Sequence, residues 1–287
     1  MKFGLLYAYW TNMWSGDYIY YSKKVKELGF DVLEISAGDL LKMSDDEIDE
    51  LKAVAKELDL EISSNIGPPK KYDVASKDPS VRMAGIKFLT DIMKKMDRLD
   101  SRSLVGVMYT YWPNDFSDLD KKSQWKRGVE SVKEMGKAAQ ELNIIMSLEV
   151  VNRFETLILN TAAEGVKFCE EVDNPNVKIL LDTFHMNIEE DNIADAIRFA
   201  GDKLGALHVG EGNRKLPGQG HLPWAEIGAA LRDIGFTGNV VAEPFILEGG
   251  DVGRDIKVFR DLSEGADEQK LDADARESLK FLRSNFL

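Results

Sequence analysis

Short apolar runs recur along the chain, and between them lie segments whose apolar positions follow a helical spacing. The runs are four to seven residues long and rich in valine, isoleucine and leucine, which is typical of buried β-strands. Eight are expected as strands, at Phe3–Tyr9, Val32–Ser36, Glu61–Ile66, Ser103–Met108, Ile144–Val150, Val177–Leu181, Ala206–Val209 and Asn239–Ala242. The helical pattern is clearest in DEIDELKAVAKELD, VKEMGKAAQELN and WAEIGAALRDIG, and several helical segments end in turn residues, at Gly29, Asn143 and Gly235.

A strand followed by a helix, repeated eight times, predicts a parallel sheet with right-handed crossovers. At 287 residues the closed form of such a sheet, a (β/α)8 TIM barrel, is the expected fold. No Pro/Ser-rich linker interrupts the chain, so residues 1–287 are expected to form a single domain. An open doubly wound sheet is the alternative, although no G-x-G-x-x-G follows the first strand to support dinucleotide binding.

Composition and charge exclude several classes of protein. Hydrophobic residues make up 44% and charged residues 30%, as in ordinary globular proteins. The net charge of −13 and the lack of a basic stripe argue against nucleic-acid binding. No 18-residue apolar run predicts a membrane span, and the N-terminus lacks the cleavage site of a secretory signal. The one cysteine, Cys169, is expected in a helix core, and a cytoplasmic location is therefore expected.

Four metal-competent side chains occur at the ends of the last four predicted strands: Glu149, Asp182, His208 and Glu243. Each also has an ordinary structural alternative. For Glu149 it is a salt bridge to Arg153, and for Asp182 it is a helix N-cap. For His208 it is a hydrogen-bonded core position, and for Glu243 it is a salt bridge at the strand end. They are separated by 33, 26 and 35 residues, about one βα unit each. Because consecutive parallel strands are neighbours, the four side chains are expected to converge on one ion.

Three carboxylates and one imidazole form a hard, anionic donor set. Such a set suits one divalent ion per chain, with Mn²⁺ expected and Co²⁺ or Mg²⁺ as alternatives, better than a thiolate-rich zinc site. Burying three carboxylates without a cation would be strongly unfavourable. The sequence therefore predicts a metal centre at the C-terminal end of the barrel.

Polar and aromatic residues in the following loops are candidates for binding a small hydroxylated ligand. Glu155, His185 and Arg214 follow the predicted metal ligands by three to six residues. Trp14, Trp112 and Phe245 stand at other strand ends and can wall a pocket. The aromatic cluster in MYTYWPNDF, with Tyr109 and Tyr111, is expected either in the core or, if exposed, as a lid or subunit contact.

The chain resembles the ketose 3-epimerase family, that of D-tagatose 3-epimerase and D-psicose (D-allulose) 3-epimerase. The resemblance extends over nearly the whole chain, and its most specific stretches are EVVNRFE, LNTAAEGV, LDTFHMNIEED, GEGNRKLPGQG and DIKVFRDLS. It implies a xylose-isomerase-like TIM barrel that forms homodimers or homotetramers. It places the metal quartet on Glu149, Asp182, His208 and Glu243, the substrate-binding trio on Glu155, His185 and Arg214, and pocket walls on Trp14, Ile66, Gly67, Trp112 and Phe245.

Several positions depart from the family pattern. The fourth strand reads VGVMYTYWP where the family has GGAL-x-SYWP, so Val107 and Met108 are unusual near the sugar. Leu6 stands where several family members have tyrosine, and Ala242 replaces a common methionine. Leu6 and Met108 are expected to line the pocket, so these departures bear on the preferred ketose rather than on the reaction.

The implied reaction interconverts C3 epimers of free ketohexoses, D-fructose with D-psicose and D-tagatose with D-sorbose. It removes the C3 proton to form an enediolate and returns a proton to the opposite face, with Glu149 and Glu243 as the two acid–base groups. An aldose–ketose isomerase on the same barrel is the nearest alternative, and a sugar-binding protein is the non-enzyme alternative. An abasic-site endonuclease would require a basic face and more than 3 histidines.

Overall fold

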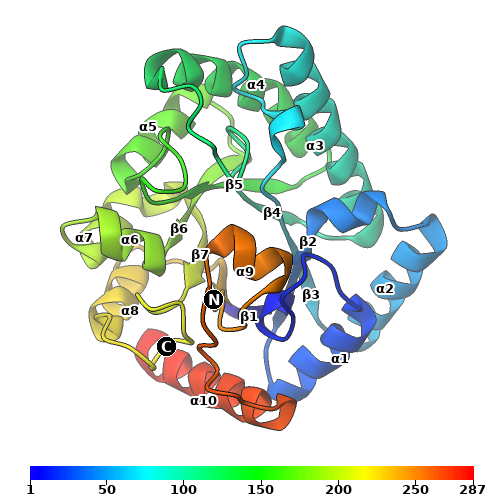
Figure 1. Cartoon of the computed structure of the whole chain (residues 1–287), viewed down its shortest axis with the longest axis vertical. Helices are drawn as coiled ribbons and strands as arrows, with labels where there is room; N and C mark the ends of the chain where they lie inside the picture. Colours follow the sequence, from blue (N-terminus) through cyan, green and yellow to red (C-terminus); the bar gives the residue numbers. More distant parts are fainter.

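A computed structural model describes residues 1–287 as a closed barrel of eight parallel strands in chain order, with β8 pairing back to β1 (Figure 1). This confirms the predicted TIM barrel and excludes the open sheet. The strands are β1 (Lys2–Leu6), β2 (Val32–Ser36), β3 (Glu61–Asn65), β4 (Ser103–Gly106), β5 (Ile145–Val150), β6 (Val177–Asp182), β7 (Leu204–Val209) and β8 (Asn239–Ala242).

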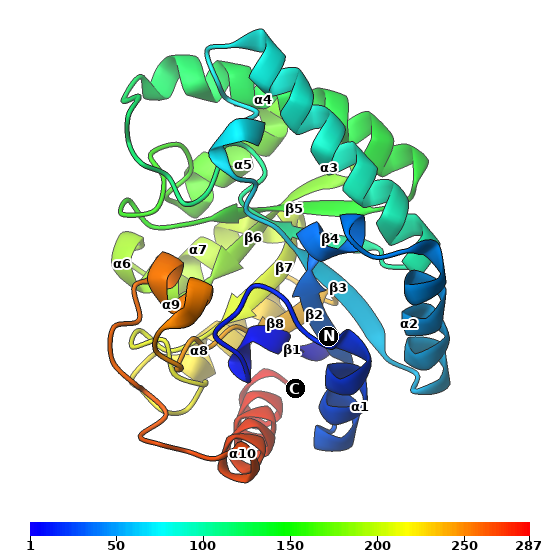
Figure 2. The same cartoon turned by 45° about the vertical axis from the view of Figure 1, so that its right-hand side comes forward.

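Helices form an outer ring around the strands, as Figures 1 and 2 show. They are α1 (Tyr18–Leu28), α2 (Asp45–Glu57), α3 (Pro79–Leu99), α4 (Lys121–Glu141), α5 (Ala162–Val172), α6 (Thr183–Glu189), α7 (Ile193–Ala200), α8 (Trp224–Asp233), α9 (Gly250–Ile256) and α10 (Glu268–Phe286). Short 3-10 helices follow β1, β2 and β3, namely η1 (Tyr7–Tyr9), η2 (Ala37–Leu41) and η3 (Lys70–Tyr72). A fourth, η4 (Gly201–Lys203), precedes β7.

Local sequence explains where the helices start and stop. At α2, Ser44 and Glu47 form a capping box, in which each side chain bonds the backbone at the other residue. The helix then buries Ile48 and Leu51 on its inner face. Helix α1 ends at Gly29, whose φ of 95° is a left-handed conformation that glycine adopts without strain. These local signals place the amphipathic helices with their apolar faces on the barrel.

Two predicted strands end two or three residues earlier in the structure, because the backbone turns before the apolar pattern stops. Tyr7–Tyr9 form η1 instead of extending β1. β4 ends at Gly106, where φ is 119° and a Cβ atom would lie 2.2 Å from the carbonyl oxygen of Ile66. Val107 and Met108 therefore lie beyond the strand, and only glycine permits the close approach of β3 and β4.

Helix α9 stands apart from the outer ring and lies in front of the barrel axis in Figure 1. It begins at Gly250, directly after Gly249, and both glycines have positive φ. Val252 donates its backbone N–H to the carbonyl of Asn12 near the first strand. The segment after β8 thus crosses the open end of the barrel before it returns to α10. No helix is both long and apolar enough to cross a membrane.

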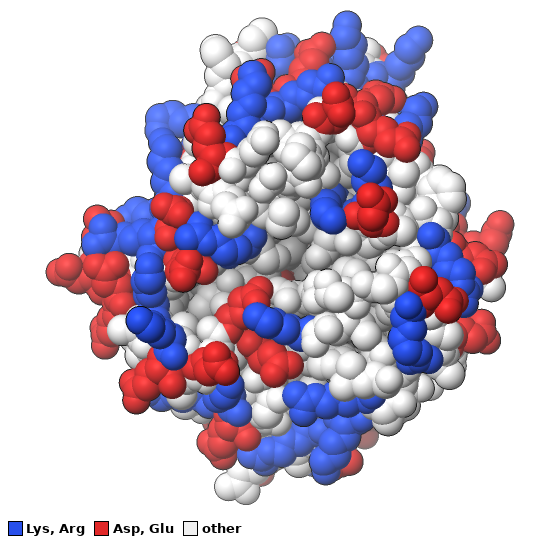
Figure 3. All heavy atoms as spheres, turned by 180° about the vertical axis from the view of Figure 1, so that it is seen from behind, with Lys and Arg blue, Asp and Glu red and all other residues white.

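Charges on the surface are mixed in sign. On the face shown in Figure 3, acidic and basic side chains surround a largely uncharged centre, and several basic side chains gather at the lower edge. Many are paired, as Arg98 is with Asp45 and Asp49.

Candidate active site

A cavity of about 300 Å³ opens at the C-terminal ends of the strands. In TIM barrels this end carries the chemistry, because the βα loops converge there. Helix α9 contributes Asp255 and Ile256 to the rim, so the cavity is closed partly by chain from outside the barrel. Both the predicted metal ligands Glu149 and Glu243 and the predicted sugar-binding residues Glu155, His185 and Arg214 line it.

The four predicted metal ligands come together beside this cavity, and two of them, Glu149 and Glu243, line it. Glu149 lies on β5, Asp182 ends β6, His208 lies on β7 and Glu243 directly follows β8. One ligand atom from each lies within 4.8 Å of the others, and all four residues are buried. The register pairs Asp182 directly with His208, which explains their proximity. This buried Glu/Asp/His/Glu group can hold a metal ion.

The structural alternatives for these residues are resolved by their contacts. Arg153 pairs with Glu189 rather than Glu149. Asp182 does cap α6, accepting from the N–H of Phe184 at 2.6 Å, and it belongs to the ligand group as well. A helix N-cap and a metal ligand are therefore compatible at this residue.

The charge of the group also fits a cation. Burial raises the pKa of Glu149 well above its usual value, and the nearby Glu243 raises it further. Burial likewise raises the pKa of Asp182. The protein's own cations thus leave the buried negative charge undercompensated, whereas a divalent ion would compensate it.

His208 presents one of its two ring nitrogens to the ligand group. Its Nε2 lies 3.0 Å from Oε1 of Glu34, and its Nδ1 lies 3.4 Å from Oε1 of Glu243. A carboxylate behind a ligating histidine usually accepts the proton of the nitrogen that does not bind metal. Glu34 therefore leaves Nδ1 as the nitrogen that can bind an ion.

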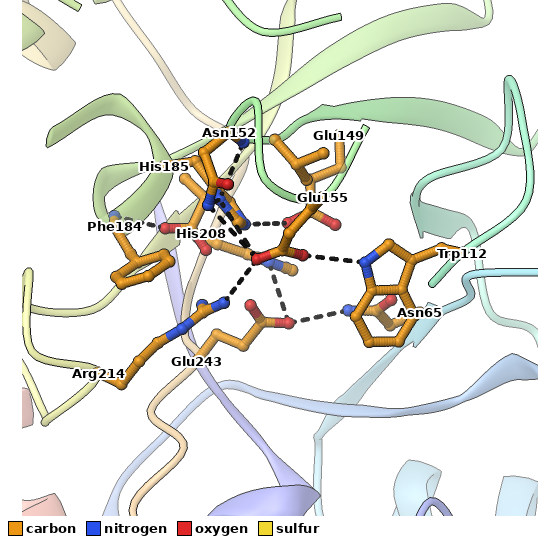
Figure 4. A network of polar contacts seen from close by, with 12 residues as sticks. Asn65, Trp112, Glu149, Asn152, Glu155, Phe184, His185, His208, Arg214 and Glu243 are labelled. Carbon is orange, nitrogen blue, oxygen red and sulfur yellow. Dashed lines mark hydrogen bonds and ion pairs between the residues drawn. The ribbon is translucent and has the colours of Figure 1, made fainter. Parts of the chain in front are cut away.

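The predicted substrate-binding trio lies beside the quartet (Figure 4). Asn152 directs its backbone N–H and its side-chain amide at Nδ1 of His185, at 3.2 and 2.7 Å, so the proton of the neutral ring lies on Nε2. That nitrogen is 3.7 Å from Oε1 of Glu149. Burial lowers the pKa of His185, which favours this neutral form.

Arg214 lies flat over the ring of Phe184, with its guanidinium carbon 3.6 Å from the ring centroid. Its Nη2 contacts Oε1 of Glu155 at 3.3 Å, and Trp112 donates to Oε2 of the same carboxylate at 2.9 Å. The remaining donors of Arg214, Nε and Nη1, are buried and have no partner in the protein. Two oriented donors are therefore available to a polar ligand in the cavity.

The apolar walls agree with the expectation at six positions and differ at one. Lining residues include the predicted Leu6, Trp14, Ile66, Gly67, Trp112 and Phe245. Met108 is fully buried in the core instead, and its neighbour Val107 faces the cavity. Strand alternation accounts for this difference, because Val105 packs inside the barrel with Leu180 and Ala206, which puts Val107 on the cavity side and Met108 on the other side.

The Tyr109–Trp112 cluster is core and cavity wall rather than exposed surface. Tyr109 is buried and donates its hydroxyl to the carbonyl of Glu149 at 2.9 Å, and Tyr111 is buried as well. Trp112 lines the cavity. The cluster is therefore not the exposed aromatic patch that the sequence allowed as a subunit contact.

Sequence reasoning missed several polar residues of the site. Glu34 interrupts the apolar run VLEIS just as Glu149 interrupts its own, so the same signal was present. Asn65 ends β3 and Asn152 follows β5, and both positions carry the strand-end signal that identified the metal ligands. Asp255, which accepts from Trp14 Nε1 at 3.0 Å, carries no signal because α9 is outside the βα pattern.

The buried carboxylates predict how pH affects stabilisation by a metal. Because the pKa values of Glu149 and Asp182 are raised, the ion-free fold favours the protonated forms of both carboxyl groups. Protonation of these groups therefore stabilises the ion-free fold below their usual pKa values, and this stabilisation is lost as pH rises through their raised pKa values. A cation binds the deprotonated forms, so the increase in Tm caused by Mn²⁺ over EDTA should grow between about pH 5 and pH 8. Thermal unfolding measures this difference, and a pH-independent difference would contradict it.

A family model and two known relatives agree with this geometry. Residues 22–285 match the xylose isomerase-like TIM barrel family. The D-psicose 3-epimerase of Ruminiclostridium cellulolyticum is 51% identical over 284 residues, covering 99% of this chain and 97% of the relative. The D-psicose 3-epimerase of Agrobacterium fabrum is 47% identical, covering 99% and 98%.

Solved structures give the same result. A crystal structure of D-psicose 3-epimerase with D-tagatose from Clostridium cellulolyticum H10 superimposes with a TM-score of 0.98 at 50% identity, covering 100% of this chain and 99% of that one. The fold and site thus define an isomerase of the xylose isomerase-like TIM barrels. Within this class the chain belongs to the D-psicose 3-epimerase family of ketose 3-epimerases.

Proposed function

We propose that the protein is a metal-dependent ketose 3-epimerase that interconverts C3 epimers of free ketohexoses. The observation that carries the proposal is the placement of Glu149 and Glu243. They come from β5 and from the end of β8, three strands apart around the barrel, and both face one cavity. Inversion at a carbon next to a carbonyl needs proton removal on one face and proton return on the other.

In this proposal one glutamate takes the proton from C3 and the other delivers a proton to the opposite face. A divalent ion held by Glu149, Asp182, His208 and Glu243 would polarise the C2 carbonyl and stabilise the negative charge that develops there. Arg214 and Glu155 hold the O1–O3 end of the sugar, and the Nε2–H of His185 lies beside O2. The aromatic walls exclude water from the reacting carbon.

The cavity favours a free sugar over a sugar phosphate. Arg214 and His185 are the only basic side chains that line it, and Arg214 is already paired with Glu155. The acidic Asp255 stands at the rim, where it would repel a terminal phosphate. Support for ketohexoses also comes from related D-psicose 3-epimerases, whose crystal structures were obtained with D-tagatose and in the presence of D-fructose.

Incubation of D-fructose with the Mn²⁺-loaded protein in deuterated water tests the proposal. We expect D-psicose, with deuterium at C3 only. An aldose product with label at C1 would instead indicate an aldose–ketose isomerase. Binding of fructose without turnover would favour the sugar-binding alternative.

The proposal also covers the bound ion, a second pair of substrates, the assembly and the location. We expect Mn²⁺ as the ion, with Co²⁺ or Mg²⁺ as substitutes, because the donor set is oxygen-rich. D-Tagatose and D-sorbose should be a second substrate pair. A homodimer or homotetramer is expected from the family resemblance alone, since Tyr109 and Tyr111 are buried and offer no exposed aromatic contact; light scattering at micromolar concentration tests the assembly. A cytoplasmic location is expected because Cys169 has no thiol partner in the chain.

Leu6 is predicted to influence the choice among ketoses. It ends β1 on the cavity wall and offers no hydrogen bond to the sugar's C4–C6 end. Leu6→Tyr adds a hydroxyl, so the ratio of kcat/KM between D-fructose and D-tagatose should change by about 10-fold, the size of one polar contact in an apolar pocket. Leu6→Phe is the matched control, because it adds the ring without the hydroxyl. Equal ratios in both variants would contradict a hydrogen-bonding effect.

A further inference from the structure

Two polar residues on β2 and β3 contact the metal-ligand group from the side opposite β6 and β7 in the strand order. Glu34 on β2 is fully buried, and Asn65 at the end of β3 lines the cavity. Asn65 donates from Nδ2 to Oε1 of Glu243 at 3.1 Å and to Oε1 of Glu34 at 3.2 Å. Figure 4 shows the contact between Asn65 and Glu243.

Chemistry fixes the orientation of the Asn65 amide. If its oxygen and nitrogen were exchanged, a carbonyl oxygen would face two carboxylates, which have no proton to donate when ionised. Its Oδ1 lies instead toward Gly106, where a Cβ atom would be only 3.0 Å away. Asn65 therefore acts as a donor to both carboxylates, and the glycine leaves room for it.

Glu34 is held on both of its oxygens. Ser63 donates to Oε2 at 2.9 Å, and Oε1 faces both Asn65 and Nε2 of His208. Asn65 and Glu34 thus form a continuous link between Glu243 and His208, two residues of the ligand group. Glu149 has no such donor on its carboxylate, since Tyr109 bonds only its backbone carbonyl.

We propose that Asn65 and Glu34 act as one positioning unit, which orients His208 and fixes the carboxylate of Glu243. Oε1 of Glu34 lies 3.0 Å from Nε2 of His208, where it can take up the proton of that nitrogen and keep Nδ1 toward the ion. Asn65 occupies Oε1 of Glu243 and leaves Oε2 without a hydrogen bond. The effect on metal binding stands on the ligand geometry alone, whereas the effect on turnover rests on the proposed epimerase function.

Asn65→Ala, Glu34→Gln and the double variant test the unit, and Ser64→Ala is the control. Ser64 is the buried neighbour of Asn65 on β3 and contacts Ser101, away from the cavity. The Mn²⁺ dissociation constant of each apoprotein is measured without substrate, from the electron paramagnetic resonance signal of free Mn²⁺. We expect weakening of about 10- to 100-fold for Glu34→Gln, as for other groups behind metal ligands, and no change for Ser64→Ala.

The double variant distinguishes a unit from two independent residues. If the two residues act together, the loss in the double variant is smaller than the product of the single losses. Asn65→Ala should also lower kcat for fructose about 10-fold with little change in KM, because Glu243 loses orientation rather than sugar contact. Wild-type kcat and Mn²⁺ affinity in Asn65→Ala, or losses that multiply, would overturn the proposal.

Failure to fold is controlled in two ways. Glu34→Gln preserves shape, and Asn65 stands on the cavity wall, where truncation removes little core packing; circular dichroism and Tm check each variant. Loss of Mn²⁺ affinity in a folded variant supports the unit even if no epimerisation is found. If the wild type epimerises fructose and the variants match it in Mn²⁺ affinity and kcat, the proposed function stands and the positioning unit is rejected.

Discussion

Glu149→Gln and Glu243→Gln are each expected to lower kcat for the conversion of D-fructose to D-psicose by about 10²- to 10⁴-fold, the usual contribution of a general acid–base group. Glutamine keeps the size of the side chain and an oxygen for the ion but cannot accept the C3 proton. Steady-state kinetics with saturating Mn²⁺ measures the loss. Glu134→Gln is the matched control, because Glu134 is an exposed partner of Lys137 on α4 and its loss should leave kcat unchanged.

Isotope exchange makes this prediction sharper. A variant that keeps one of the two bases should still exchange the C3 hydrogen of one epimer with deuterated water, slowly and without inversion. The two variants should therefore exchange opposite epimers, which assigns each glutamate to one face of the sugar. Exchange of both epimers by either variant would contradict a two-base reaction.

Asp182→Asn is expected to remove bound metal and activity together. Its carboxylate belongs to the buried ligand group, and asparagine is a much weaker ligand for a hard cation. His208→Ala should have the same effect, with an additional loss of stability, because the buried Glu34 would lose the imidazole beside its Oε1 and keep only Ser63 and Asn65. Metal content after dialysis, about one ion per chain in the wild type, and kcat with added Mn²⁺ measure the result.

Two results would contradict the predicted role of Asp182 and its partner ligands. Full activity of the wild type after chelation, or full activity of metal-free Asp182→Asn, would exclude the quartet as the catalytic metal centre. Ser147→Ala is a useful control for a substitution on β5, because Ser147 is buried but lies outside the ligand group. It should retain bound metal.

Much of the fold and the ligand group follows from local patterns. Strand and helix periodicities repeat at the spacing of βα units, and consecutive parallel strands must be neighbours. The amino-acid sequence alone therefore predicts that Glu149, Asp182, His208 and Glu243 lie together, because each interrupts or ends an apolar run on one of four successive strands. Helix ends at Gly29, Asn143 and Gly235 were recognisable because all three adopt the left-handed conformation that their residue types favour.

Other features depend on contacts between distant segments, which no local pattern encodes. Closure of the barrel brings Asn65 to Glu243, 178 residues later, and β2 to within reach of His208. Val105 and Val107 face the inside of the barrel and Met108 faces away from it, which only the pairing of β4 with β5 establishes. Helix α9 is joined to the segment after β1 at the rim by hydrogen bonds to Asn12 and from Trp14. Periodicity determined which residues stand at strand ends, whereas barrel closure and backbone turns decided which of them touch.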